Sequence, residues 1–204
     1  MTRVGIVNIG IGNIGALVSA VYNLGWDYKK VSSPNDLNDL THLILPGVGA
    51  FDSAMKKLKS TLLIDPIINF ANNKKPLLGI CLGMQLLANI GHENTITEGL
   101  GLIEGEAVKL KNKKLPHIGW NSIIKTNYSP IIKNIPDDID FYFVHSFCFQ
   151  AYNKEDILTF TEYEKKFVSA IQKNNVLGVQ FHPEKSQKNG IKIINNFCQW
   201  DGIC

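Results

Sequence analysis

Hydrophobic and polar positions follow two alternating patterns in the first half of the chain. Short apolar runs are typical of strands, and stretches with apolar residues three or four apart are typical of amphipathic helices. The expected strands lie at 3–9, 28–31, 42–46 and 75–81. The expected helical segments lie at 13–24 and across 51–73. This alternation predicts β-α-β units and a mostly parallel sheet, in which the KPLLGIC strand is buried on both faces.

Beyond about residue 100, strand-like segments follow one another closely, which predicts antiparallel additions to the sheet. These segments lie at 106–110, 121–126, 140–149, 157–163, 167–172 and 176–181. A final helix is expected over 189–200, where Ile191, Ile194 and Phe197 share one face. We find no internal repeat and no linker long enough to divide the chain. The expected architecture is a single domain over residues 1–204, with three α/β/α layers, a mostly parallel central sheet and an antiparallel extension.

Composition and charge favour a protein that works in water. Of the 204 residues, 45% are apolar and 19% are charged, and no apolar run reaches the length of about 18 residues that a membrane span needs. The net charge is +3, and the lysine clusters at 56–59 and 109–114 lack interleaved aromatic residues, which favours a solvated face over a nucleic-acid site. The amino terminus enters the first strand without the features of a secretory signal. We therefore expect a cytoplasmic protein without a membrane or nucleic-acid partner.

The cysteines show neither CxxC spacing nor a paired Cys/His pattern, so we expect no metal site and, in a reducing compartment, free thiols. Three of them have unremarkable positions: Cys148 falls in an apolar strand, Cys198 in the final helix and Cys204 at the end of the chain. Cys81 differs because it stands between two glycines in the stretch GICLG.

Another glycine pattern near the amino terminus has the spacing of a dinucleotide-binding turn. Gly10, Gly12 and Gly15 spell G-x-G-x-x-G between an expected strand and an expected helix. A dinucleotide site also needs an acidic residue about 20 positions further on, at the end of the next strand. Asp27 precedes that strand instead of ending it. The pattern therefore favours a tight β-α turn, and we expect no cofactor.

The stretch around Cys81 has the G-x-S-x-G spacing of a nucleophile elbow, with sulfur in place of oxygen. The other interpretation is a small apolar residue that fills space in a buried strand. A free thiol with a pKa of about 8.5 is only a few per cent thiolate at pH 7. A helix N-terminus contributes about 0.3–1 kcal/mol, which is less than one pKa unit. A nucleophilic Cys81 would therefore need a base as well.

His182 is the best candidate for that base, because it ends the apolar strand of GVQFHPEKS, and sites in α/β sheets form where strands end. Glu184 lies two residues on, and Pro183 between them restricts the backbone. An isolated HPE sequence is also compatible with a capped loop. Together with Cys81, however, the three side chains predict a nucleophile, a base and a carboxylate that orients the base.

Acyl chemistry also requires hydrogen-bond donors for an oxyanion. The glycine-rich stretch LPGVGAF at 45–51 follows an expected strand, and its backbone N–H groups are candidate donors. An ordinary β-α turn is the other interpretation. The backbone N–H of Leu82, next to the nucleophile, is the natural second donor.

Five motifs in this order, LPGVGAF, LLGICLGMQLL, PHIGWN, FVHSF and GVQFHPEKS, resemble the class I (triad-type) glutamine amidotransferases, which have a flavodoxin-like α/β fold. The resemblance covers essentially the whole chain. Within that family the chain is most similar to the glutaminase subunits of imidazole glycerol phosphate synthase. The combination of GxCxGMQ with HPE is typical of the class, whereas PGVGAF and PHIGWN on a separate chain are typical of this kind of subunit.

The resemblance implies roles for particular residues. Cys81, His182 and Glu184 match the triad that hydrolyses L-glutamine through a glutamyl thioester, and Val48 and Leu82 match the donors of the oxyanion hole. Further positions match those that hold the substrate: Gly49, Gln85, Glu93, Ser146 and Phe147.

The resemblance also implies a partner, a (β/α)8 cyclase subunit that receives ammonia in a heterodimer and closes the imidazole ring in histidine biosynthesis. Trp120, Asn121, Tyr142 and Lys185 match positions near that subunit. Without the resemblance, Trp120 would be interpreted as a core aromatic residue. Three alternatives stay open: a paralogous glutaminase that feeds a surface-sugar amidation enzyme, a cysteine hydrolase or protease on the same scaffold, and a catalytically idle binding subunit.

Overall fold

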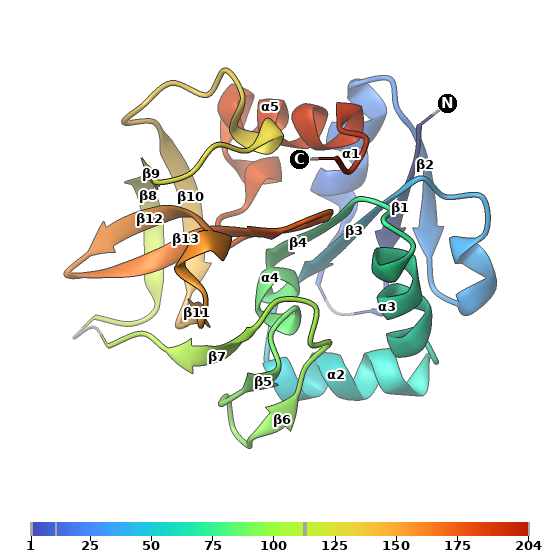
Figure 1. The fold of residues 1–204 in the computed structure, drawn as a ribbon, viewed down its shortest axis with the longest axis horizontal. Helices are drawn as coiled ribbons and strands as arrows, with labels where there is room; N and C mark the ends of the chain where they lie inside the picture. The colour runs from blue at the N-terminus through green and yellow to red at the C-terminus, as the bar shows by residue number, and fades with distance from the viewer. Residues whose placement is uncertain (1, 11, 112–113, 204) are drawn as a thin grey trace.

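The computed structural model describes residues 2–10, 12–111 and 114–203. Five parallel strands form one side of its main sheet, from the edge strand inward, in the order β2-β1-β3-β4-β14 (Figure 1). They are β1 (Arg3–Val7), β2 (Asp27–Val31), β3 (His42–Gly47), β4 (Leu77–Cys81) and β14 (Val176–Val179). β4 is buried at every position, as its continuous apolar sequence predicts.

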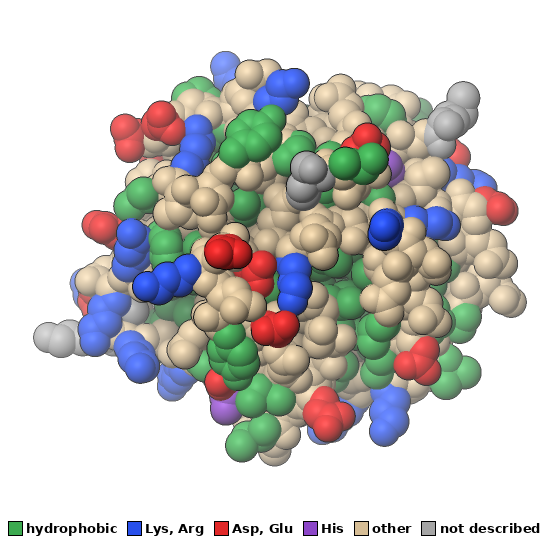
Figure 2. All heavy atoms as spheres, viewed as in Figure 1, with side chains coloured by type: hydrophobic (Ala, Val, Ile, Leu, Met, Phe, Trp, Pro, Cys, Tyr) green, Lys and Arg blue, Asp and Glu red, His purple; other side chains and the backbone are tan. Residues whose placement is uncertain are grey.

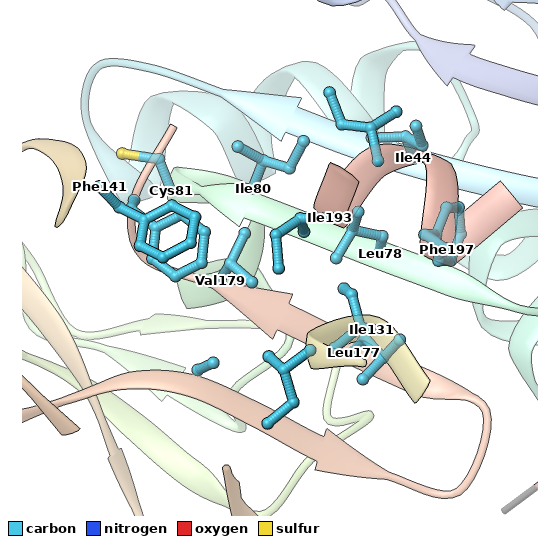
Figure 3. Packing of buried hydrophobic residues seen from close by; sticks show 14 of the residues in the cluster. Ile44, Leu78, Ile80, Cys81, Ile131, Phe141, Leu177, Val179, Ile193 and Phe197 are labelled. Atoms are coloured by element: carbon cyan, nitrogen blue, oxygen red, sulfur yellow. The ribbon is translucent and has the colours of Figure 1, made fainter. Parts of the chain in front are cut away.

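Helices cover both faces of this parallel sheet, which gives the three predicted layers (Figure 1). α1 (Gly15–Asn23) and α5 (Gln187–Gln199) pack on one face. α2 (Phe51–Ser60), α3 (Ile64–Asn72) and the short α4 (Leu82–Leu86) pack on the other. In Figure 3 the core under α5 includes Ile44, Ile193 and Phe197, and Cys81 lies at one end of this cluster beside Phe141. None of the helices in the described part of the chain is long and apolar enough to cross a bilayer.

The antiparallel extension continues from β14 along the order β13-β11-β7. Its strands are β5 (Ile90–Gly91), β6 (Thr97–Glu98), β7 (Gly105–Lys109), β9 (Ile124–Lys125), β11 (Phe147–Ala151), β12 (Ile157–Tyr163) and β13 (Lys165–Lys173). The described residues also form four single-turn 3₁₀ helices: η1 (Pro34–Leu37), η2 (Pro130–Ile132), η3 (Lys154–Asp156) and η4 (Pro183–Lys185). The predicted fold class, an α/β sheet with a parallel centre and an antiparallel extension, is confirmed.

Two strand predictions were wrong, and both concern a separate ribbon. The segment 140–149 is not one strand: β10 (Asp140–His145) ends before Ser146, and β11 begins after it in the main sheet. The strand expected at 121–126 is divided in the same way: β8 (His117–Ser122) pairs with β10, whereas β9 pairs with β12 in the main sheet. The break at Ser146 allows Phe141 and Phe143 to pack in the core under α5, while Phe149 packs on the opposite face.

Lysines gather at one edge of the molecule. Figure 2 shows them along the left side of the face drawn, over the ends of β7, β12 and β13. Both lysine clusters predicted from the sequence are exposed wherever the structure describes them, in agreement with a solvated face. Lys113 lies outside the described residues, as does Cys204. The edge cluster consists of Lys109, Lys111, Lys154, Lys165 and Lys166.

Candidate active site

Cys81 is the last residue of β4 and immediately precedes α4. Its backbone has φ 54° and ψ −110°, a conformation that a residue with a Cβ rarely adopts. Such strain costs about 1–3 kcal/mol and persists only where the surrounding structure enforces it. The predicted nucleophile therefore sits on a sharp, strained turn from strand to helix, as the G-x-S-x-G spacing indicates.

The two flanking glycines are required by close backbone contacts. A Cβ on Gly83 would lie 1.7 Å from the carbonyl oxygen of Leu45 in β3. A Cβ on Gly79 would lie 2.6 Å from the carbonyl oxygen of Gly83. Since both contacts are with backbone, a side-chain rotation cannot relieve them. The glycines thus allow α4 to turn back tightly across β3 and β4.

We expect Gly83→Ala to destabilise the protein by at least about 3 kcal/mol, the upper end of the range for overpacking, because the added methyl group meets a carbonyl in a central strand. The free energy of unfolding in denaturant measures this. Gly47→Ala is the matched control, since its Cβ would meet only side-chain atoms of Leu82 at 3.2 Å or more. Equal costs for the two variants would contradict this account of Gly83.

His182 and Glu184 lie together at the end of β14, the strand that pairs with β4. The Nδ1 atom of His182 is 2.8 Å from Oε1 of Glu184, and both side chains are at least nine-tenths buried. The backbone N–H of His182 donates to the carbonyl oxygen of Tyr142 in β10, which ties this turn to the ribbon. The structure thus provides the orienting contact that the HPE sequence predicts.

Burial alone would lower the pKa of His182, but hydrogen bonding to Cys81 and Glu184, together with their negative charges, outweighs burial and raises that pKa to about 9. Nε2 of His182 makes no well-aligned hydrogen bond, although it is close enough to the sulfur for this electrostatic effect. The raised pKa of His182 therefore favours the imidazolium form of its side chain at pH 7.

The predicted oxyanion loop lies beside Cys81 because of strand register. Gly47, the last residue of β3, pairs directly with Cys81, so Val48 and Gly49 follow at the edge of the site. Gly49 has φ 95°, which glycine adopts readily. Gly12 approaches this loop so closely that a Cβ there would lie 2.5 Å from Cγ2 of Val48. Close packing accounts for this glycine of the amino-terminal pattern.

A cavity of about 410 Å³ opens beside the sulfur. Eight residues predicted from the sequence to act in the site line it: Val48, Gly49, Cys81, Leu82, Gln85, Glu93, Ser146 and Phe147. The carboxylate of Glu93 accepts a hydrogen bond of 2.9 Å from the backbone N–H of Phe51, at the start of α2. His182 and Glu184 line a smaller space on the other side of Val48.

Two buried polar residues in this region were not among the predicted site residues. His145 lines the cavity, and its Nδ1 atom lies 2.8 Å from the carbonyl oxygen of Phe147. Burial lowers the pKa of His145 to about 3 and the pKa of its neighbour His117 to about 4, so both rings are neutral at pH 7. Gln180 is fully buried and its Nε2 atom lies 3.7 Å from the sulfur of Cys81. The sequence signal that could have identified them is a polar residue within a mostly apolar segment, His145 in FVHSF and Gln180 in GVQF.

The residues predicted to contact a partner fall on two faces of the β8–β10 ribbon. Trp120 and Tyr142 are paired across the strands, with ring centroids 5.9 Å apart, and Nζ of Lys185 lies 5.9 Å from the centroid of the Tyr142 ring. Trp120 is 47% exposed, so it is not a core residue. Asn121, the next residue along β8, points to the opposite face, where its Nδ2 donates to the carbonyl oxygen of Glu162.

A larger cavity of about 660 Å³ lies under the lysine-rich edge, between β7, β11 and β12. The thiol that lines it belongs to Cys148, and burial raises the pKa of that thiol to about 12. Such a thiol stays protonated at pH 7 and is a poor nucleophile. The chemistry of the side chains therefore selects the smaller cavity beside Cys81 as the candidate active site.

Comparison with known proteins identifies the family of this chain. The model of the family "Glutamine amidotransferase class-I" matches residues 6–200. "Imidazole glycerol phosphate synthase subunit HisH 2" of Methanococcus maripaludis is 45% identical over 199 residues, which cover 95% of this chain and 98% of that protein. "Imidazole glycerol phosphate synthase subunit HisH" of Desulfitobacterium hafniense is 40% identical over 198 residues, covering 97% and 94%.

Among solved structures, "Structure of PurLQS from Thermotoga maritima" includes a chain that aligns with a TM-score of 0.78 at 18% identity, covering 96% of this chain and 97% of that chain. At this identity the likeness concerns the fold alone. The family match and the full-length relatives lead to one conclusion: this chain belongs to the class I glutamine amidotransferases.

Proposed function

We propose that this chain is the glutaminase subunit of an imidazole glycerol phosphate synthase. It hydrolyses L-glutamine to glutamate and ammonia, and passes the ammonia to a (β/α)8 cyclase subunit for histidine biosynthesis in the cytoplasm. The observation that carries the proposal is the strained Cys81 beside a His182–Glu184 pair with a 2.8 Å contact, at the edge of a cavity. The names of the relatives support the choice of synthase.

In this mechanism the sulfur of Cys81 attacks the carboxamide carbon of glutamine while His182 holds the thiol proton. Backbone N–H groups of Val48 and Leu82 donate to the oxyanion. When the C–N bond breaks, His182 gives its proton to the departing nitrogen. Ammonia leaves, and Cys81 remains joined to the substrate as a glutamyl thioester. Water then attacks the thioester with His182 as base, and glutamate is released with the thiol restored.

The cavity also offers groups suited to the α-amino and α-carboxylate groups of glutamine. Glu93 supplies a carboxylate for the α-ammonium group. Both N–H groups of the Gln85 side chain are used within the protein, by Phe147 and Gln180, so only its Oε1 is left to accept from the substrate. We assign Gly49, Ser146 and Phe147 to the same task, since they line the same cavity.

The outer face of the β8–β10 ribbon is suited to the partner subunit. Ile118 and Trp120 are exposed there, and Tyr142 and Lys185 adjoin them. Exposed apolar and aromatic residues grouped in this way are typical of interfaces. Val144 of the same ribbon places its carbonyl oxygen 3.9 Å from the sulfur of Cys81, so a subunit bound to this face would lie close to the point where ammonia forms.

The decisive experiment measures glutamate release from glutamine by this chain alone and with the histidine-pathway barrel subunit of its organism, loaded with that subunit's nucleotide ligand. We expect a low basal rate that rises by orders of magnitude in the complex. Trp120→Ala should reduce this stimulation more than it changes the KM for glutamine. Tyr22→Ala removes an aromatic side chain that is 67% exposed near the end of α1, and serves as the matched control.

Activity that is indifferent to that barrel would assign the chain to a paralogous system that amidates surface sugars. Release of new amino termini from peptides, without glutamine hydrolysis, would favour a cysteine protease instead. If Cys81 is not labelled by a glutamine-like electrophile, the chain is a catalytically idle binding subunit.

A further inference from the structure

Gln180 is a fully buried amide between the predicted nucleophile and a substrate-lining residue. It follows β14, two residues before His182, and its backbone N–H donates to the carbonyl oxygen of Ser169. Its side chain has two contacts: Nε2 lies 3.7 Å from the sulfur of Cys81, and Oε1 accepts a 3.1 Å hydrogen bond from Nε2 of Gln85. Burying an amide is costly unless it is hydrogen-bonded, so these contacts account for its presence in an apolar segment.

The orientation of both amides follows from a single acceptor, the carbonyl oxygen of Phe147. A carbonyl only accepts hydrogen bonds, so the atom of Gln85 that lies 2.9 Å from it is the NH₂ group. The other hydrogen of that NH₂ group then points to Gln180, which must present its Oε1. The remaining end of Gln180, an N–H donor, is therefore directed at the sulfur of Cys81.

His145 supports the same orientation of the two glutamine amides. Because its ring is neutral, its Nδ1–H donates to the carbonyl oxygen of Phe147, and its Nε2 accepts from His117, whose Nδ1 lies 3.1 Å away. The carbonyl of Phe147 thus accepts two hydrogen bonds, from His145 and from Gln85. Reversal of either glutamine amide would place two acceptors or two donors face to face.

We propose that Gln180 stabilises the thiolate of Cys81 by donating a hydrogen bond to its sulfur, and that Gln85 and the Phe147 carbonyl hold Gln180 in the donating orientation. The inference rests on the proposed role of Cys81 as nucleophile. A donor to the charged form of an acid lowers the pKa of that acid. The carbonyl oxygen of Val144, 3.9 Å from the sulfur, accepts only from the neutral thiol and has the opposite effect.

The test follows alkylation of Cys81 by iodoacetamide as a function of pH, quantified on the peptide that contains Cys81. Glu93, His145, His182 and Glu184 are the titratable side chains of the two adjoining cavities, and they stay the same in every Gln180 variant. Gln180→Met keeps the approximate volume without the donor. We expect it to move the midpoint of alkylation upward by about one pH unit, which is about a tenfold loss of rate below the midpoint.

Gln180→Glu removes the donor and adds a negative charge, so its upward shift should exceed that of Gln180→Met. Ser169→Ala is the matched control, because it removes another buried hydrogen bond, 2.8 Å to Thr159, without touching Cys81. It should lower the melting temperature and leave the alkylation profile unchanged. In glutamine hydrolysis, the Gln180 variants should lose kcat with little change in KM.

A profile for folded Gln180→Met within a few tenths of a pH unit of the wild type would overturn the inference. If the Gln180 variants do not fold, the wild-type protein supplies the test: the side-chain NH₂ resonance of Gln180 must shift as Cys81 ionises and lose that titration after alkylation. A resonance that does not respond also overturns it. A Cys81→Ser variant that still hydrolyses glutamine at the wild-type rate would instead refute the proposed role of Cys81 as nucleophile, whatever the Gln180 variants show.

Discussion

Cys81→Ala should abolish glutamine hydrolysis, lowering kcat by at least about 10⁴-fold, because no other group in the site can form the glutamyl thioester. Synthesis by the partner subunit with added ammonium salt should remain near the wild-type rate, since the outer face of the β8–β10 ribbon is unchanged. Both rates are measured in the assembled complex, with glutamine or ammonia as the nitrogen source.

Cys148→Ala is the control for this substitution. It removes a buried thiol of the same size in β11, and it should leave glutamine hydrolysis almost unchanged. Loss of both the glutamine-dependent and the ammonia-dependent rates in Cys81→Ala would show that the division of labour between the subunits is wrong.

Glu184→Gln should reduce kcat by about 10²–10⁴-fold, through the tautomer of His182. Oε1 of Glu184 accepts from Nδ1–H, so when the imidazole is neutral its Nε2 is the atom that can take the proton of Cys81. The NH₂ group of glutamine can donate to Nδ1, and Nε2 then carries the proton and cannot take one from Cys81. Losing the charge also removes one of the two partners that raise the pKa of His182, so that pKa should fall.

The measurements are the steady-state rate and the pH profile of kcat/KM. Glu104→Gln provides the control, because Glu104 forms an exposed ion pair with Lys173 and takes no part in the site. A Glu184→Gln enzyme with wild-type kcat would refute the orienting role of the carboxylate, even if Cys81→Ala is inactive.

The parts of the site that depend on local geometry could be predicted from the sequence. Glycines on both sides of Cys81 indicate a sharp turn wherever a buried strand meets a helix, and the structure has that turn. The HPE sequence likewise places a carboxylate within reach of an imidazole two residues away. The strands that carry both motifs were also apparent, because each is a short apolar run.

The parts that depend on register and on changes of sheet could not be predicted. FVHSFCF is apolar except for His145 and Ser146, and two polar residues do not distinguish a break between sheets from one continuous strand, so the break at Ser146 could not be predicted from the hydrophobic pattern. The strand β8 also lacks a clear hydrophobic pattern. Gly119 interrupts it, and its apolar residues Ile118 and Trp120 lie on an exposed face. Trp120 and Asn121 are neighbours in sequence yet face opposite sides of the ribbon, which only the pairing with β10 determines.

The strained backbone of Cys81 lowers the stability of the fold at the position where the reaction needs a sulfur atom. Glycine adopts a positive φ at little cost, so Gly at this position would relieve most of the strain while removing the sulfur. As long as selection maintains glutamine hydrolysis, the lineage keeps the less stable residue. In a descendant released from that selection, glycine becomes the favoured replacement, and its appearance between two glycines would mark the loss of the reaction in a chain that retains the fold.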